Sequence, residues 1–190
     1  AFFAAHPEVA LLHTATVRET PSARATAAFQ GDAPAGAFCD LFHTDRDINT
    51  LTVMVRREVV EQAGGFDERR EIHVEDWDLW LRIAEAHEIV GEPEVRVRTR
   101  IHQGGISADP IVVYTQGCRV VEAASKRLAA AGSPDAGYAR RQAARWHVKL
   151  GRRLARDGRP HEADAMFRHA IELHPLGRFD VLRAKLSPKH

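Results

Sequence analysis

Two kinds of hydrophobic pattern alternate in the first part of the chain. Runs of apolar and β-branched residues at 9–17, 48–55 and 89–97 predict strands. Between the last two runs, residues 57–63 predict one or two helical turns, and apolar residues at i, i+3, i+4 and i+7 predict a helix over 76–86. The buried face of this second helix is expected to consist of Trp77, Trp80, Leu81 and Ala84. Strands and helices therefore alternate here, which is typical of an α/β fold.

Proline and glycine mark the connections between these elements. Residues 1–5 resemble the last turn of a helix, and the prolines and glycines of 20–36 predict a loop. A short helix is expected at 37–42. Gly64 and Gly65 are expected to end the helix that precedes them, because glycine readily adopts a positive φ.

The sequence changes in character after Pro110. It becomes rich in Ala, Arg and Leu, and we predict helices at 111–131, 136–157, 160–174 and 178–186. We therefore expect two regions. An α/β region spans 1–109, and an all-α extension spans 110–190.

The charge of the chain reverses close to the same boundary. Residues 1–117 contain 11 Lys and Arg against 19 Asp and Glu, whereas residues 118–190 contain 16 against 7. A basic region of this kind faces nucleic acid, an anionic membrane surface or an acidic part of its own chain. We favour the last of these. We expect no nucleic-acid role, because the arginines are not interleaved with aromatic residues.

Composition argues against several classes of protein. The chain has 190 residues and no run of about 18 apolar ones, so we expect no transmembrane segment. Its first residues lack the basic and apolar stretches of a signal peptide. Cys39 and Cys118 lie far apart, which argues against a disulfide scaffold and a cysteine-based zinc site. These features predict a cytoplasmic protein, with peripheral contact at the inner face of the membrane as the alternative.

The segment 64–82 carries the most informative chemistry. Glu75 and Asp76 stand at the start of a predicted helix, where free backbone N–H groups and the helix dipole favour an ionised carboxylate. A carboxylate held in this way suits a general base that takes a proton from a hydroxyl.

A structural interpretation accounts for the same residues. Asp76 would then be a simple helix cap, and Trp77 and Trp80 would belong to the core. Asp78 and Arg82 are four residues apart on the predicted helix, so they would form an ordinary surface pair.

Five short motifs follow one another in the first region. They are H-P-E-V-A-L-L (6–12), a strand ending in Arg-Arg-Glu (53–58), G-G-F-D-E (64–68), E-D-W-D-L-W-L-R (75–82) and R-x-H (100–102) followed by Ser107. Their order and spacing resemble the C-terminal half of a family 2 glycosyltransferase with the GT-A fold. The resemblance covers roughly residues 1–110, and it rests on five pieces in order, since each one alone is weak.

The resemblance implies roles for particular residues. In that family the aspartate of the E-D motif is the usual catalytic base, which would be Asp76, and Glu75 would help to shape the acceptor pocket. The histidine of the R-x-H loop often binds the divalent metal on the nucleotide diphosphate, which would be His102. The substrate-binding residues implied in the same way are Gly64, Gly65, Phe66, Asp67, Trp77 and Arg100.

The resemblance covers only part of the family's domain. The nucleotide-binding half, with its D-x-D metal site, would precede residue 1, so we expect that it is missing here and that the chain alone is inactive. Two D-x-D triplets, 45–47 and 76–78, do not follow a hydrophobic strand that could bring them to a diphosphate. We regard both as coincidence. The Mg²⁺ or Mn²⁺ ion is therefore expected only together with the missing half.

A second pattern lies in the helical extension. Its residues with characteristic spacing are Leu150, Gly151, Leu154, Ala163, Phe167, Ala170 and Pro175. This spacing resembles one tetratricopeptide repeat over about 144–177, which implies an antiparallel helical hairpin with its turn at 158–160. In the favoured interpretation the hairpin packs against the rest of the protein. In the alternatives it docks a protein partner, or its arginines contact anionic lipid.

Together these features predict an inverting glycosyltransferase of polysaccharide biosynthesis. It would transfer a sugar from a nucleotide-diphosphate donor to the hydroxyl of a glycan or other acceptor, with Asp76 as base. The alternative is a non-catalytic interaction module that binds a partner through the helical extension. We find no G-x-S-x-G, phosphate-loop or H-E-x-x-H motif. The histidines other than His102 are scattered along the chain, and we assign them no role.

Overall fold

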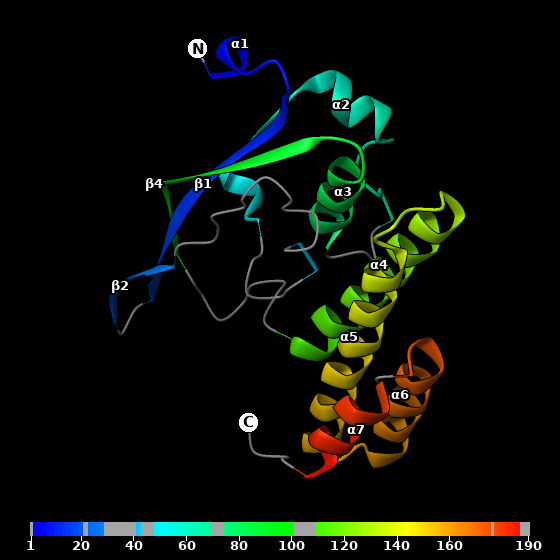
Figure 1. Cartoon of the computed structure of the whole chain (residues 1–190). Helices are drawn as coiled ribbons and strands as arrows, with labels where there is room; N and C mark the ends of the chain where they lie inside the picture. Colours follow the sequence, from blue (N-terminus) through cyan, green and yellow to red (C-terminus); the bar gives the residue numbers. More distant parts are fainter. Residues whose placement is uncertain are drawn as a thin grey trace. The chain divides into compact units, whose positions relative to one another are not determined.

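The computed structural model describes residues 2–20, 23–28, 41–42, 48–69, 74–100, 109–175 and 177–186. The chain divides into two compact units, 1–105 and 106–190, close to the boundary expected after residue 109. The first unit combines strands and helices, and the described part of the second contains helices (Figure 1). The mixed α/β class expected from the hydrophobic pattern is therefore confirmed.

A four-stranded mixed sheet forms the centre of the first unit. Its central strand is β1 (Val9–Thr20), which pairs in parallel with β4 (Glu88–Arg100) along most of its length. β3 (Val53–Val55) and β2 (Ala23–Ala28) run antiparallel to the first and second parts of β1. Every residue from Val9 to Thr16 is buried, as expected for a strand that is covered on both faces.

The described residues of the first unit include three α-helices. They are α1 (Phe2–Ala5), α2 (Arg57–Gln62) and α3 (Glu75–Ala84), and the last two lie in the connection from β3 to β4. The predicted helices at 57–63 and 76–86 are confirmed. The predicted buried face of α3 is only partly right, because Trp77 and Ala84 are half-buried. The buried residues of α3 are Leu79, Trp80, Leu81 and Ile83. Three of them are consecutive, so α3 is covered on more than one side.

The strand predicted at 48–55 is wrong in its first part. Residues Thr50–Thr52 form a short 3₁₀ helix, η2, and only Val53–Val55 are extended in β3. Asn49 explains the difference, because its side-chain oxygen accepts the Leu51 N–H at 3.0 Å and its carbonyl oxygen accepts the Thr52 hydroxyl at 2.7 Å. Local side-chain bonds of this kind compete with the ladder of a sheet.

The loop predicted at 20–36 is also partly wrong. Its residues Ala23–Ala28 form β2, whose register with β1 begins at the pair Thr20↔Ala23. Alanine is depleted in strands, so the sequence A-R-A-T-A-A has little strand preference of its own. The strand is stabilised by its pairing with β1. Of the short helix predicted at 37–42, only Leu41 and Phe42 lie within the described residues.

All four helices predicted in the second unit are confirmed. They are α4 (Pro110–Ala130), α5 (Ala136–Arg156), α6 (Pro160–Leu173) and α7 (Gly177–Leu186). Asp109 caps α4 by accepting the Ile111 N–H at 2.8 Å, and Pro110 occupies the first turn, where no N–H is needed. None of the helices in the described residues combines the length and the apolar composition that a membrane span requires.

Glycine allows two close approaches between the long helices. A Cβ at Gly117 of α4 would lie 2.4 Å from the ring of Trp146 in α5. A Cβ at Gly151 of α5 would lie 2.6 Å from the ring of Phe167 in α6. The hairpin predicted from the spacing of Gly151 and Phe167 is therefore present, and its two helices meet at these residues.

Candidate functional site

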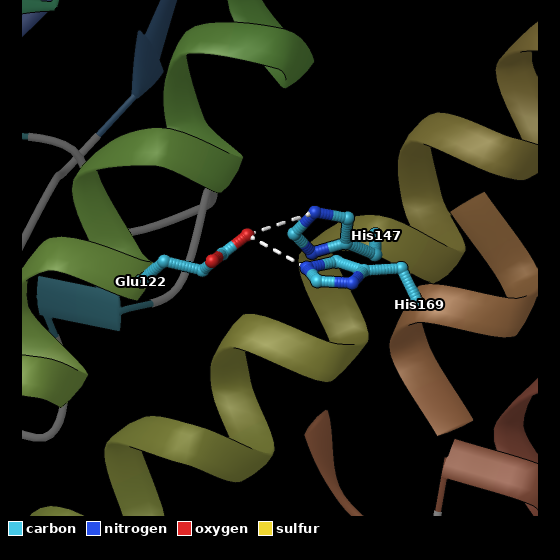
Figure 2. Close-up of side chains that lie close together, drawn as sticks. All are labelled: Glu122, His147 and His169. Carbon is cyan, nitrogen blue, oxygen red and sulfur yellow. Dashed lines mark hydrogen bonds and ion pairs between the residues drawn. The ribbon is translucent and has the colours of Figure 1, made fainter. Parts of the chain in front are cut away.

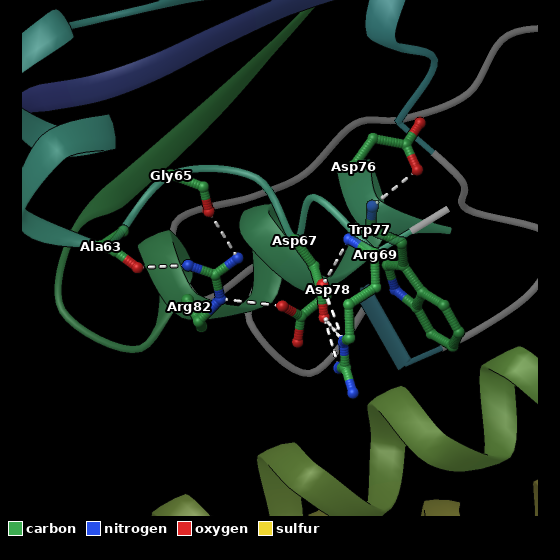
Figure 3. Close-up of polar contacts among 8 residues, drawn as sticks. All are labelled: Ala63, Gly65, Asp67, Arg69, Asp76, Trp77, Asp78 and Arg82. Carbon is green, nitrogen blue, oxygen red and sulfur yellow. Dashed lines mark hydrogen bonds and ion pairs between the residues drawn. The ribbon is translucent and has the colours of Figure 1, made fainter. Parts of the chain in front are cut away.

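Arg82 holds the loop that contains Gly64 and Gly65 against α3 (Figure 3). Its guanidinium donates to the carbonyl oxygens of Ala63 and Gly65, at 2.8 Å for the second, and Nε donates to Asp78 Oδ2 at 2.9 Å. The predicted pair of Asp78 and Arg82 is present, but both side chains are only 18% exposed, so it is not an ordinary surface pair. Gly64 and Gly65 have φ angles of 84° and 70°, which confirms the positive φ expected there.

Asp76 lies in the first turn of α3 with both carboxylate oxygens hydrogen-bonded. Oδ1 accepts the backbone N–H of Trp77 at 2.7 Å, and Oδ2 accepts the hydroxyl of Thr50. Val74, at the N-cap, offers no side-chain bond, so Asp76 satisfies one of the N–H groups that a helix start leaves free. These bonds orient the carboxylate, and each oxygen retains a second lone pair for another donor. Glu75 is half-buried beside it as the first residue of α3.

The two tryptophans of α3 differ in their surroundings. Trp80 is 2% exposed and meets the ring of Phe66 edge-on, with ring centroids 6.0 Å apart. Trp77 is half-buried, and its indole N–H donates to the carbonyl oxygen of Leu41 at 2.6 Å. The place of Trp80 in the core is confirmed, whereas the one polar group of Trp77 is engaged within the protein. Phe66 is 45% exposed, so part of its ring is open to a ligand.

Asp67 is bound by Arg69 in the same loop. The Arg69 side chain donates from Nε to both carboxylate oxygens at 2.9 and 3.1 Å, and its backbone N–H donates to Oδ1 at 3.1 Å. These hydrogen bonds lower the pKa of Asp67 to about 2. Its carboxylate is therefore ionised at neutral pH, and its charge is balanced within the loop.

Arg56 joins two of the sequence motifs. It belongs to the Arg-Arg-Glu motif, and its Nε donates to the carbonyl oxygen of Val9 at 2.9 Å. Its Nη2 donates to the carbonyl oxygens of Phe3 and His6 at 2.8 and 3.0 Å. The segment 6–12 is thereby tied to the end of β3.

Several predicted site residues lie outside the described part of the chain. The backbone of Arg100 ends β4, but its side chain is not described, and His102, Ser107 and the triplet 45–47 are not described. The roles of Arg100 and His102 stay predictions, and so does the Mg²⁺ or Mn²⁺ ion expected at His102.

Two histidines to which we assigned no role meet in the second unit. His147 of α5 and His169 of α6 place their Nε2 atoms 3.1 and 3.2 Å from Glu122 Oε1 of α4 (Figure 2). These two histidines are far apart in the sequence, and the fold brings them together at Glu122. A usable signal existed, because the two histidines lie eleven residues before and eleven residues after Gly158 in the turn. In an antiparallel hairpin, positions at equal distances from the turn lie opposite each other on the two helices.

Comparison with protein-family models, with curated proteins and with solved structures gives no match. Any function must therefore be argued from the residues of this chain and their geometry.

Proposed function

We propose that the first unit is the acceptor-side part of an inverting glycosyltransferase, with Asp76 as its general base. The observation that carries the proposal is the contact between motifs that are separate in the sequence. Arg82 connects the E-D-W-D-L-W-L-R helix to the G-G-F-D-E loop, and Arg56 connects the Arg-Arg-Glu motif to H-P-E-V-A-L-L. These contacts make each pair of motifs one local structure, which supports the resemblance on which the proposal rests.

The surroundings of Asp76 suit the chemistry of a base. A general base needs a carboxylate that is ionised, oriented and within reach of the acceptor hydroxyl. The Trp77 N–H and the Thr50 hydroxyl hold both oxygens of Asp76, and the carboxylate stands at the N-terminal end of a helix. The helix dipole favours negative charge at that end.

The proposed reaction moves one proton and exchanges one bond. Asp76 takes the proton of the acceptor hydroxyl while that oxygen bonds to the anomeric carbon of the donor sugar. The bond from this carbon to the diphosphate breaks on the opposite face, and its electron pair leaves with the nucleoside diphosphate. The sugar is transferred with inversion, and the proton remains on Asp76 until water takes it.

The test is an Asp76→Asn substitution in the whole gene product, so that any donor-binding residues outside these 190 are present. The side-chain oxygen of asparagine can still accept the Trp77 N–H, and its NH2 group can donate to the Thr50 hydroxyl oxygen, but it cannot take the proton, so folding is retained and catalysis is not. We expect release of nucleoside diphosphate from a panel of UDP-, GDP- and dTDP-sugars to fall by about 10²–10⁴-fold. The affinity for the donor, measured by calorimetry, should be nearly unchanged.

Glu61→Gln is the matched control. It makes the same change of carboxylate to amide at an exposed position of α2, and it should leave transfer at the wild-type rate. Wild-type turnover in Asp76→Asn would remove Asp76 from the role of base. Absence of transfer by the wild type with every donor would overturn the enzymatic function itself and favour the interaction module.

A further inference from the structure

Three side chains from three helices meet inside the second unit. Glu122 Oε1 lies 3.1 Å from His147 Nε2 and 3.2 Å from His169 Nε2. Figure 2 marks both contacts with dashed lines. One nitrogen or oxygen from each residue lies within 4.8 Å of the other two. The three residues come from α4, α5 and α6, so the cluster depends on the tertiary structure.

The helices are held close together near this cluster. Gly151 lies one turn after His147, and its contact with the Phe167 ring brings α5 against α6. Trp146, next to His147, lies over Gly117 of α4. His147 is 5% exposed, so its position is set by packing on all sides. Packing therefore holds His147 in place next to Glu122.

The hydrogen bonds of His147 leave a lone pair directed at a carboxylate. Its Nδ1 lies 3.0 Å from the carbonyl oxygen of Ala143, which can only accept, so this nitrogen carries the proton. A neutral imidazole has a single N–H, and Nε2 then presents a lone pair to Glu122 Oε1 at 3.1 Å. Two acceptors at this distance repel one another unless a cation or a further proton lies between them.

His169 repeats the arrangement from the other helix. Its Nδ1 lies 3.4 Å from Glu172 Oε2, and its Nε2 faces Glu122 Oε1 at 3.2 Å. Both nitrogens of His169 face carboxylates, and in the tautomer with its proton on Nδ1 the Nε2 lone pair is directed at Glu122. A backbone carbonyl on one histidine and a carboxylate on the other are the usual partners of metal-binding imidazoles.

Two of the three spacings in this cluster match tetrahedral coordination. Zinc binds imidazole nitrogen and carboxylate oxygen at about 2.0–2.1 Å, and the edge of a tetrahedron with such bonds is about 3.3 Å. The two distances from Glu122 Oε1, 3.1 and 3.2 Å, are close to this edge. Two imidazoles and one carboxylate suit Zn²⁺ and its neighbours in the first transition row, whereas Mg²⁺ and Ca²⁺ prefer oxygen ligands.

We propose that Glu122, His147 and His169 bind a divalent transition-metal ion of the Zn²⁺ class that joins helices α4, α5 and α6. The His169 side chain is 38% exposed, so this side of the site is open to solvent and a water molecule completes the coordination. The proposal concerns residues of the second unit only, so it holds or fails independently of the role of Asp76.

The test is metal titration of the whole chain, purified without a histidine tag and treated with a chelator. We expect one Zn²⁺ per chain by calorimetry, a higher unfolding temperature with Zn²⁺, and visible absorption bands of tetrahedral Co²⁺. Mg²⁺ should produce none of these effects. Absence of stoichiometric Zn²⁺ binding would overturn the site and leave a hydrogen-bonded cluster, and equal binding of Mg²⁺ would overturn the metal class.

Three variants separate this site from the other histidines of the chain. His169→Ala should weaken Zn²⁺ binding by more than about 100-fold, whereas His161→Ala, at an exposed position of the same helix, should leave it unchanged. Glu172→Gln should weaken it by about tenfold, because Glu172 orients His169 without touching the ion. Glu172 is 73% exposed, so this variant keeps the fold. Equal affinity in His169→Ala and the wild type would place the ion elsewhere and overturn the proposal.

Discussion

A methyl group added at Gly151 should destabilise the helical unit. A Cβ built there lies 2.6 Å from Phe167 Cε1 and 2.9 Å from Cδ1. Carbon atoms in contact are normally separated by about 3.5–4.0 Å, so the overlap is severe. Phe167 is 6% exposed, and its ring cannot withdraw without disturbing the packing around it. The substitution Gly151→Ala therefore tests the close approach of α5 and α6 directly.

Two opposing contributions decide the sign of this change. Overpacking a filled interior costs about 1–3 kcal/mol. Replacing glycine by alanine inside a helix gains about 1 kcal/mol, because alanine loses less backbone entropy on folding. The overlap involves a buried ring rather than a flexible chain end, so we expect the cost to exceed the gain. Because the overlap is severe, we take the cost from the upper part of this range, about 2–3 kcal/mol, which leaves an expected net loss of about 1–2 kcal/mol in the free energy of unfolding.

Gly137 provides the matched control in the same helix. No atom lies within 4 Å of a Cβ at this position in the first turn of α5, so Gly137→Ala should show only a helix-propensity gain of at most about 0.5–1 kcal/mol. Both variants are measured by denaturant unfolding followed by circular dichroism. Combining Gly151→Ala with Phe167→Leu should cost less than the sum of the two single changes, because the smaller side chain leaves room for the methyl group. A Gly151→Ala variant as stable as the wild type, beside a stabilised Gly137→Ala, would refute the close approach.

Two further predictions concern the first unit and the buried thiol. Arg82→Lys should lower the free energy of unfolding by about 1–2 kcal/mol in denaturant titrations, because lysine lacks the planar fork that reaches two carbonyls and a carboxylate. The control Arg57→Lys, at an exposed position, should change this free energy by less than about 0.5 kcal/mol. Equal losses in the two variants would contradict the anchoring role of Arg82. Burial, with the nearby charge of Glu122, raises the pKa of Cys118 from 9.0 to about 12, so the unfolded thiol loses its proton at a lower pH than the folded one. Stability should therefore fall as pH rises from about 9 towards 12, and Cys118→Ala should remove this part of the pH dependence when unfolding is measured across that range.

The elements that were predictable are those with local signals. Of the four helices described in the second unit, α4, α5 and α6 have regular apolar spacing, and two of them begin with proline in the first turn. β1 is a run of apolar and β-branched residues, and Gly64 and Gly65 mark the end of α2. Each of these signals acts over a few neighbouring residues, so no distant contact is needed to interpret it.

The elements that were missed depend on partners or on competing local bonds. β2 has a sequence with little strand preference and is ordered by pairing with β1. The 3₁₀ helix at Thr50–Thr52 is held by Asn49, whose side chain outweighs the β-branched pattern around it. Apolar alternation alone could not reveal either one.

For the candidate site, the sequence by itself determined which chemical groups are present and which local element carries each one. It assigned Asp76 to a helix start and the glycines to a loop, because capping and positive φ are local properties. Only the tertiary structure decided which groups meet. Arg82 reaches the carbonyls of a preceding loop, and Glu122, His147 and His169 converge from three helices. The physical reason is that such contacts depend on how the helices pack and on their register. A small residue such as Gly151 sets that register only through its contact with a partner, here the ring of Phe167.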